Sequence, residues 1–134
     1  MKRLDLPTLA REYANNGQHA EQVFRYALTG ERKSADNTPA SVAPDVLDFQ
    51  IKSARATVCK GLDLDEYLAR DTATRYAYVT ADFLTAYVMD KSEWREFCET
   101  FGTVTRESSK NGGATKIRLK HETPALREWL NKRA

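Results

Sequence analysis

The stretch Pro44–Cys59, which reads PDVLDFQIKSARATVC, determines how the rest of this chain is interpreted. It opens with a Pro-Asp pair, which favours a turn because proline fixes φ and aspartate can bond its own downstream backbone. From Leu47 onward apolar and polar residues alternate, and the polar positions are Asp48, Gln50 and Lys52. A period of two predicts a strand with one face in a core and the other face polar. That polar face lines up a carboxylate, an amide and an amine.

These residues resemble the motif of the PD-(D/E)XK nuclease superfamily, which has the restriction-endonuclease-like fold. In this chain the motif reads Pro44-Asp45, followed by Gln50-Ile51-Lys52. The resemblance implies that Asp45 ligates a divalent metal ion and that Gln50 stands at the second ligand position, where an acid is more usual. It also implies that Lys52 positions or helps to activate the attacking water.

The cofactor that the resemblance implies is Mg²⁺, for which Mn²⁺ can substitute. Phosphodiester hydrolysis needs a cation on the phosphate oxygens and a source of hydroxide near neutral pH, and Mg²⁺ prefers oxygen ligands. Members of the superfamily often supply a further glutamate from an upstream helix, and the candidate here is Glu21. It lies at the margin of the apolar stripe of a helix predicted over residues 17–29.

The spacing leaves two choices for the first metal ligand. Asp45 and Gln50 are an odd number of residues apart, so an unbroken strand would point them to opposite faces. A bend between Val46 and Asp48 would bring them together, and bulges are common beside active sites. Without such a bend, Asp48 is the reserve ligand, because it shares a face with Gln50.

Length and composition indicate one globular domain spanning residues 1–134. The 134 residues are 41% hydrophobic and 30% charged, which is typical of a folded domain with a core of its own. No apolar run approaches the length of a membrane span, and we expect a cytoplasmic protein. Cys59 and Cys98 are expected to be reduced, buried thiols, and with His19 and His121 they do not form a zinc-binding spacing.

Charge is distributed unevenly along the chain. Residues 103–134 contain eight Lys or Arg against three Glu, a balance of +5, which leaves −3 for the first 102 residues of a chain whose total is +2. The segments TVTRES and TKIRLKH flank a glycine-containing turn and predict a basic hairpin, which could lie along a nucleic-acid groove. A solvated sheet face is an equally good interpretation of these charges. The residues expected to contact nucleic acid are Ser53, Arg55, Arg106, Lys110, Lys116, Arg118 and Lys120.

Other patterns predict the remaining elements. Residues 54–60 either extend the central strand or form its hairpin partner, and Asp63 with Glu66 resembles a capping box that opens a short helix. Ser92 is expected to cap a helix that ends at Gly102, and Thr123 to cap the last helix. Further segments are predicted as helix at 6–14 and as strands at 75–80 and 84–89.

Together these features predict an α/β domain with a mixed central sheet flanked by helices, restriction-endonuclease-like in fold. The expected function is that of a Mg²⁺-dependent DNA endonuclease of the restriction, homing or mobile-element type. One site per chain suggests a homodimer or a higher symmetric oligomer, because cutting a duplex needs two sites. The alternatives are a non-catalytic nucleic-acid-binding module with a decayed nuclease site, and an interaction domain that uses the helices carrying Trp94 and Trp129.

Overall fold

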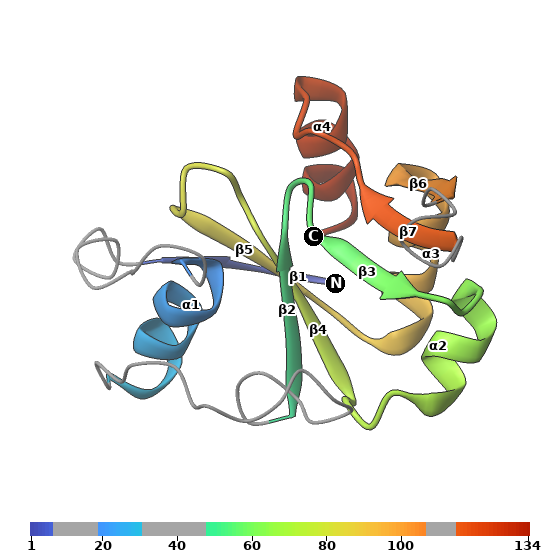
Figure 1. Ribbon diagram of the computed structural model, residues 1–134. Helices are drawn as coiled ribbons and strands as arrows, with labels where there is room; N and C mark the ends of the chain where they lie inside the picture. Colours follow the sequence, from blue (N-terminus) through green and yellow to red (C-terminus); the bar gives the residue numbers. More distant parts are fainter. Residues whose placement is uncertain (7–18, 31–47, 107–114) are drawn as a thin grey trace.

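The computed structural model describes residues 1–6, 19–30, 48–106 and 115–134 (Figure 1). Within these ranges one strand precedes the first helix, and two strands stand between each helix and the next. The elements are β1 (Lys2–Asp5), α1 (His19–Thr29), β2 (Phe49–Ser53), β3 (Thr57–Lys60), α2 (Leu64–Arg70), β4 (Arg75–Val79), β5 (Thr85–Met89), α3 (Lys91–Phe101), β6 (Gly102–Arg106), β7 (Thr115–Leu119) and α4 (Pro124–Arg133).

The strands belong to two sheets. Sheet A has four strands in the order β1-β5-β4-β2, in which β2 runs parallel to β4 and the other neighbours are antiparallel. Sheet B has three antiparallel strands in the order β3-β7-β6. The predicted α/β class, with a mixed sheet flanked by helices, is confirmed, and sheet B is an additional layer. The restriction-endonuclease-like topology stays a prediction.

One face of sheet A packs against α1. Phe49 and Ile51 of β2 are buried on this face together with Val23 and Phe24 of α1. The rings of Phe24 and Phe49 meet edge to face with their centroids 5.0 Å apart. The predicted strand alternation therefore directs its apolar side chains at the helix that precedes the strand in the sequence.

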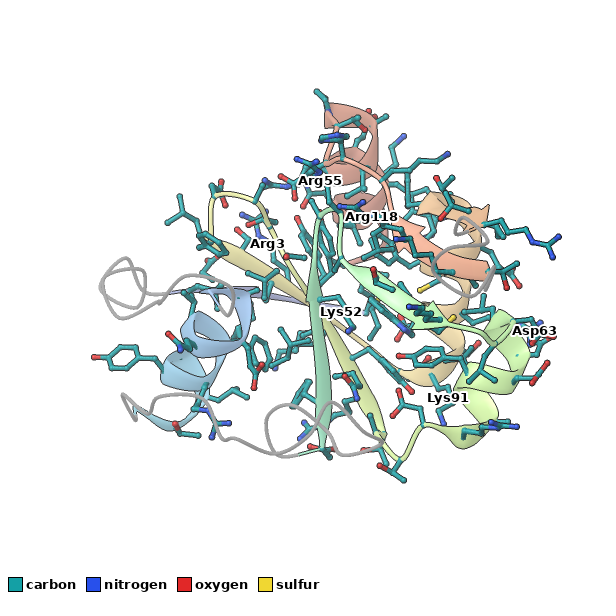
Figure 2. The ribbon with its side chains drawn as sticks, viewed as in Figure 1. Arg3, Lys52, Arg55, Asp63, Lys91 and Arg118 are labelled. Atoms are coloured by element: carbon teal, nitrogen blue, oxygen red, sulfur yellow. The ribbon has the colours of Figure 1, made fainter. Side chains whose placement is uncertain are left out.

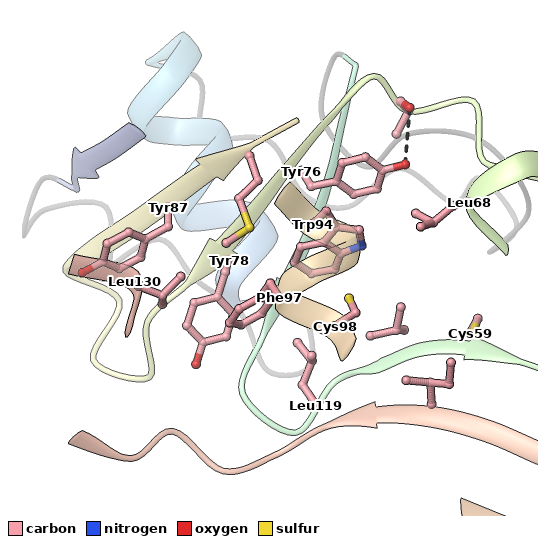
Figure 3. Packing of buried hydrophobic residues seen from close by; sticks show 14 of the residues in the cluster. Cys59, Leu68, Tyr76, Tyr78, Tyr87, Trp94, Phe97, Cys98, Leu119 and Leu130 are labelled. Carbon is pink, nitrogen blue, oxygen red and sulfur yellow. Dashed lines mark hydrogen bonds between the residues drawn. The ribbon is translucent and has the colours of Figure 1, made fainter. Parts of the chain in front are cut away.

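The other face of sheet A packs against α3, α4 and sheet B (Figure 3). Tyr76 stacks on Trp94 at 5.4 Å, and Tyr78 contacts Phe97 at 5.1 Å between ring centroids. All four of these aromatic side chains are completely buried. Sheet B covers part of this cluster with the inward side chains of its strands, among them Leu119.

Capping residues set the ends of three helices, and one prediction about them was wrong. Asp63 and Thr123 cap α2 and α4 as expected, since their side chains accept hydrogen bonds from backbone N–H groups three residues later. Helix α3, however, is capped by Asp90 and not by Ser92. Asp90 and Glu93 form a reciprocal capping box, which satisfies two backbone donors where Ser92 would satisfy one.

The segment after β2 does not extend it or pair with it. Instead β3 forms the edge of sheet B, where it pairs with β7. Sheet B also depends on Gly102, the residue at which α3 ends and β6 begins, because a Cβ there would collide with the carbonyl oxygen of Cys98. Within the part of the chain described above, no helix has the length and apolar character needed to cross a membrane.

Candidate nucleic-acid interface

Sheet B has one buried face and one exposed face. Val58, Cys59, Ile117 and Leu119 point into the core, each less than a tenth exposed. The opposite face is called the basic face below. Its residues are Thr57, Lys60, Thr103, Thr105, Lys116 and Arg118.

The strands of sheet B have a strongly positive balance of charge. They contain four basic residues and no acidic residue. The register places Lys60 directly opposite Lys116 on the neighbouring strand. Arg118 lies between Thr57 and Thr103 on the neighbouring strands. Lysine and arginine are the usual phosphate contacts in nucleic-acid binding, and threonine hydroxyls can also donate hydrogen bonds to phosphate oxygens.

A tight turn at the end of β2 brings another arginine to one end of the basic face. The N–H of Ala56 donates to the carbonyl of Ser53 at 3.2 Å, and Arg55 occupies the third position of this turn with φ of 67°. Glycine is the residue that this left-handed conformation favours, and a side chain there carries backbone strain of the order of 1 kcal/mol. The turn therefore holds an exposed arginine at a position where a glycine would have no backbone strain.

The strained turn is attached to β7 by its backbone. Arg118 donates from Nε to the carbonyl oxygen of Arg55 at 2.7 Å, and the N–H of Arg55 donates to the carbonyl of Lys120 at 3.4 Å. Figure 2 shows Arg55 and Arg118 close together above Lys52. Three cations, Arg55, Arg118 and Lys120, are thus exposed at this end of sheet B.

Of the predicted metal-site residues, the structure brings Gln50 and Lys52 together. They lie beside Tyr76 and Tyr78 in the parallel register and share their face of sheet A. This is the face that meets α3 and sheet B, so Lys52 projects into the space between β2 and β3, as Figure 2 shows. Both side chains are partly buried.

Lys52 has two buried thiols for neighbours. Burial raises the pKa of both Cys59 and Cys98 above the usual value, and the Lys52 ammonium opposes this rise with a smaller Coulombic attraction. These cysteines are therefore neutral at physiological pH and poor nucleophiles, as expected of buried structural thiols.

Asp48, the reserve metal ligand, is engaged by Arg75. The guanidinium contacts both carboxylate oxygens, at 2.8 Å from Nε and 2.5 Å from Nη2, and the hydroxyl of Thr74 donates at 2.5 Å. These hydrogen bonds hold the pKa of Asp48 well below its usual range. The Arg75 guanidinium also lies over the ring of Phe49 at 4.1 Å. The geometry accounts for Asp48 as a structural residue that fixes the start of β2 against β4.

The structure does not bring Glu21 to Gln50 and Lys52. Glu21 belongs to α1, which covers the opposite face of sheet A. Asp45 lies outside the described residues, and so does Lys110. Among the residues that the structure describes, no group of three acidic, histidine or cysteine side chains could hold a metal ion. The described residues therefore do not by themselves provide the ligands of a Mg²⁺ site.

The remaining residues predicted to contact nucleic acid do not all lie on one surface. Some lie on the basic face of sheet B, one lies on the other face of sheet B, and one lies on sheet A. The predicted sharing of one face by Lys116 and Arg118 is confirmed by the burial of Ile117 between them. Arg106 pairs with Thr115 and directly follows Thr105, which lies on the basic face. Because successive side chains of a strand alternate in direction, Arg106 projects to the opposite side. Ser53 lies opposite Val79, on the α1 face of sheet A.

Lys60 is a member of the basic face that the sequence did not reveal. A β-bulge interrupts the pairing of β3 with β7, and consequently the neighbours Val58 and Cys59 are both buried. This doubled burial breaks the alternation that would have identified Lys60 as an outward residue. A strand pattern that permits one extra buried residue would have identified Lys60 as a residue that points outward.

Comparison with known protein families, with curated proteins and with solved structures finds no match to this chain. The resemblance to the PD-(D/E)XK superfamily consequently stays a prediction that depends on the residues from Pro44 to Lys52.

Proposed function

We propose that this protein binds nucleic acid, with duplex DNA as the primary ligand, through the basic face of sheet B. The observation that carries the proposal is the gathering of Lys60, Lys116 and Arg118 on one face of sheet B, the face that does not pack on the core. Phosphate contacts by Lys and Arg supply most of the affinity of nucleic-acid binding, and a sheet can place several of them at regular intervals.

The cations at the end of β7 extend this surface. Arg55 and Lys120 continue the positive charge beyond Arg118, and the strain at Arg55 has a rationale if its guanidinium must project from the turn. The surface thus offers several cations in succession, which could contact successive phosphates of one strand.

The test is the salt dependence of DNA binding, measured by fluorescence anisotropy with a labelled duplex. The double variant Lys60→Gln/Lys116→Gln removes two of the proposed phosphate contacts. The matched control, Lys2→Gln/Lys132→Gln, removes the same charge from exposed positions on β1 and α4. Each lost phosphate contact should reduce the steepness of log K against log salt by about 0.9, so the double variant should lose roughly 2.

Two results would contradict the proposal. One is the absence of salt-dependent binding by the wild-type protein at low ionic strength. The other is an equal loss of affinity in the test variant and in the control, because only overall charge would then matter. Single-stranded DNA and RNA as competitors establish which nucleic acid is preferred.

A metal-dependent endonuclease is the second candidate, favoured by the position of Gln50 and Lys52 side by side with the lysine partly accessible between the sheets. In this proposal Asp45 and Gln50 would hold Mg²⁺ or Mn²⁺, which supplies Lewis-acid activation of the phosphate and of water. Lys52 would orient the attacking water. A symmetric dimer would provide one site for each strand of the duplex.

Cleavage of a mixed pool of plasmid and phage DNA with Mg²⁺ or Mn²⁺ tests the second candidate. Lys52→Ala and Asp45→Ala should each abolish cutting while leaving DNA binding at the wild-type level. Binding without cutting by the wild-type protein would leave the first proposal standing alone. Cutting that persists in both variants would remove these residues from the site.

A further inference from the structure

Strand β6 lies at the edge of sheet B in the part of the chain that the structure describes. Strand β6 is the last strand of sheet B, and among the described residues it pairs only with β7. Val104, at its centre, is 69% exposed, the largest value among the exposed large hydrophobic residues described. Edge strands are usually protected by a central lysine, a proline or an inward charge, and the sequence GTVTR has none of these at its middle.

We propose that β6 pairs antiparallel with β6 of a second copy of the chain, about a two-fold axis at Val104. In this register Val104 lies opposite its own counterpart, Thr103 lies opposite Thr105 of the second copy, and Gly102 lies opposite Arg106. A two-fold axis makes the interface self-complementary, since every pair on one side is repeated on the other.

The side-chain chemistry of β6 favours this register. The two Val104 side chains bury each other, and cross-strand threonine pairs are favourable neighbours. The only charged residue of the strand, Arg106, faces a glycine, so no like charges meet directly. A register shifted by two residues toward the C-terminus would place Val104 opposite Arg106 and lose the apolar pair.

Charge repulsion between the two copies is weak in this arrangement. The two β7 strands would be three strand spacings apart, or roughly 14 Å, because neighbouring strands lie about 4.8 Å apart. This separation exceeds the Debye length of about 8 Å at physiological ionic strength, so salt screens most of the repulsion between their Lys116 and Arg118 residues. Both basic faces would lie on the same side of one continuous sheet.

Salt should therefore act in opposite directions on the two associations. A pairing between five-residue strands buries little surface and gives a weak dimer, which higher salt strengthens by screening the basic faces. DNA binding weakens as salt rises. The self-association inference stands independently of the proposed function, because it is tested without nucleic acid.

The first experiment is disulfide trapping with Val104→Cys under mild oxidation, followed on non-reducing gels. Residues opposite each other in an antiparallel pair have Cβ atoms near the range that a disulfide can bridge. Leu84→Cys is the matched control, since Leu84 is 37% exposed and lies just before β5 of sheet A. The native cysteines are both buried and should leave the wild-type protein uncrosslinked.

The expected result is a covalent dimer as the main product of Val104→Cys and only the wild-type background for Leu84→Cys. Sedimentation velocity of the wild-type protein should show a concentration-dependent shift from monomer to dimer that increases with salt. Val104→Lys places two ammonium groups at the axis and should abolish that shift, with its circular dichroism and unfolding midpoint unchanged. Equal crosslinking of the two cysteine variants, or a shift that persists in Val104→Lys, would overturn the inference.

Discussion

Sheet A and sheet B differ in how many of their faces are covered. Sheet A is covered by α1 on one side and by α3, α4 and sheet B on the other, and its central tyrosines are completely buried. Sheet B covers the core with one face and leaves the other exposed, with Lys60, Lys116 and Arg118 on it. A covered sheet supplies stability, whereas an exposed face rich in cations is available to a ligand.

The polar face of the central strand β2 is directed at another layer of the domain. Gln50 and Lys52 are polar residues on a covered sheet, and their face meets another layer of the same domain. The polar residues of sheet B meet no such layer in the described structure. A sequence pattern with one polar face therefore does not by itself identify a ligand site, because that face can be directed at another part of the fold.

The largest effect on stability is expected from Phe97→Ala. This change removes a side chain of α3 that packs against sheet A. Phe97 is completely buried, and its ring contacts Tyr78 at 5.1 Å and Trp94 at 5.5 Å between centroids. Truncating a buried phenylalanine removes transfer free energy and leaves a cavity, so the free energy of unfolding should fall by about 3–5 kcal/mol. Chemical denaturation followed by circular dichroism measures the loss.

Lys120→Gln is the control for that experiment, because Lys120 is exposed at the end of sheet B. It should change the free energy of unfolding by no more than about 0.5 kcal/mol. If both variants destabilised the protein equally, the division into a covered sheet and an exposed sheet would be incorrect.

The sequence allowed part of this comparison to be predicted. The alternation in β2, the helix caps at Asp63 and Thr123, and the basic hairpin of β6 and β7 are local patterns, and each is present in the structure. Local patterns report which residues share a face, because side-chain periodicity is a property of the strand or helix itself.

Long-range pairing could not be predicted in the same way. Nothing near β3 in the sequence indicates that it pairs with β7, some sixty residues later, or that α1 covers the face opposite Lys52. The role of Asp48 likewise depends on Arg75, a residue brought beside it by the parallel pairing of β2 with β4. These arrangements depend on how layers pack, which one strand's pattern does not encode.

A smaller effect is expected from Asp48→Asn, and it should depend on pH. The folded-state pKa of Asp48 lies below its unfolded value of about 3.9, so the ionised carboxylate stabilises the folded state above that pH. Both partners are partly exposed, which limits the contribution to about 1 kcal/mol at neutral pH. The difference between wild type and variant should shrink as the pH falls below about 4.

Unfolding midpoints measured between neutral and strongly acidic pH test this assignment, with Asp5→Asn as the control. Asp5 contacts Arg3 at 3.4 Å on the exposed edge strand β1. A pH-independent difference for Asp48→Asn would mean that the carboxylate charge does not contribute to the pairing with Arg75.

An effect of similar size is expected at Arg55, where two substitutions separate strain from charge. Arg55→Gly and Arg55→Ala both remove the guanidinium, but only glycine relaxes the left-handed backbone at φ of 67°. Arg55→Gly should therefore be more stable than Arg55→Ala by about 1 kcal/mol. If Arg55 contacts phosphate, both variants should lose the same DNA affinity, and the steepness of the salt dependence should fall by about 0.9 in each. Wild-type affinity in the glycine variant would show that the Arg55 guanidinium does not contact phosphate.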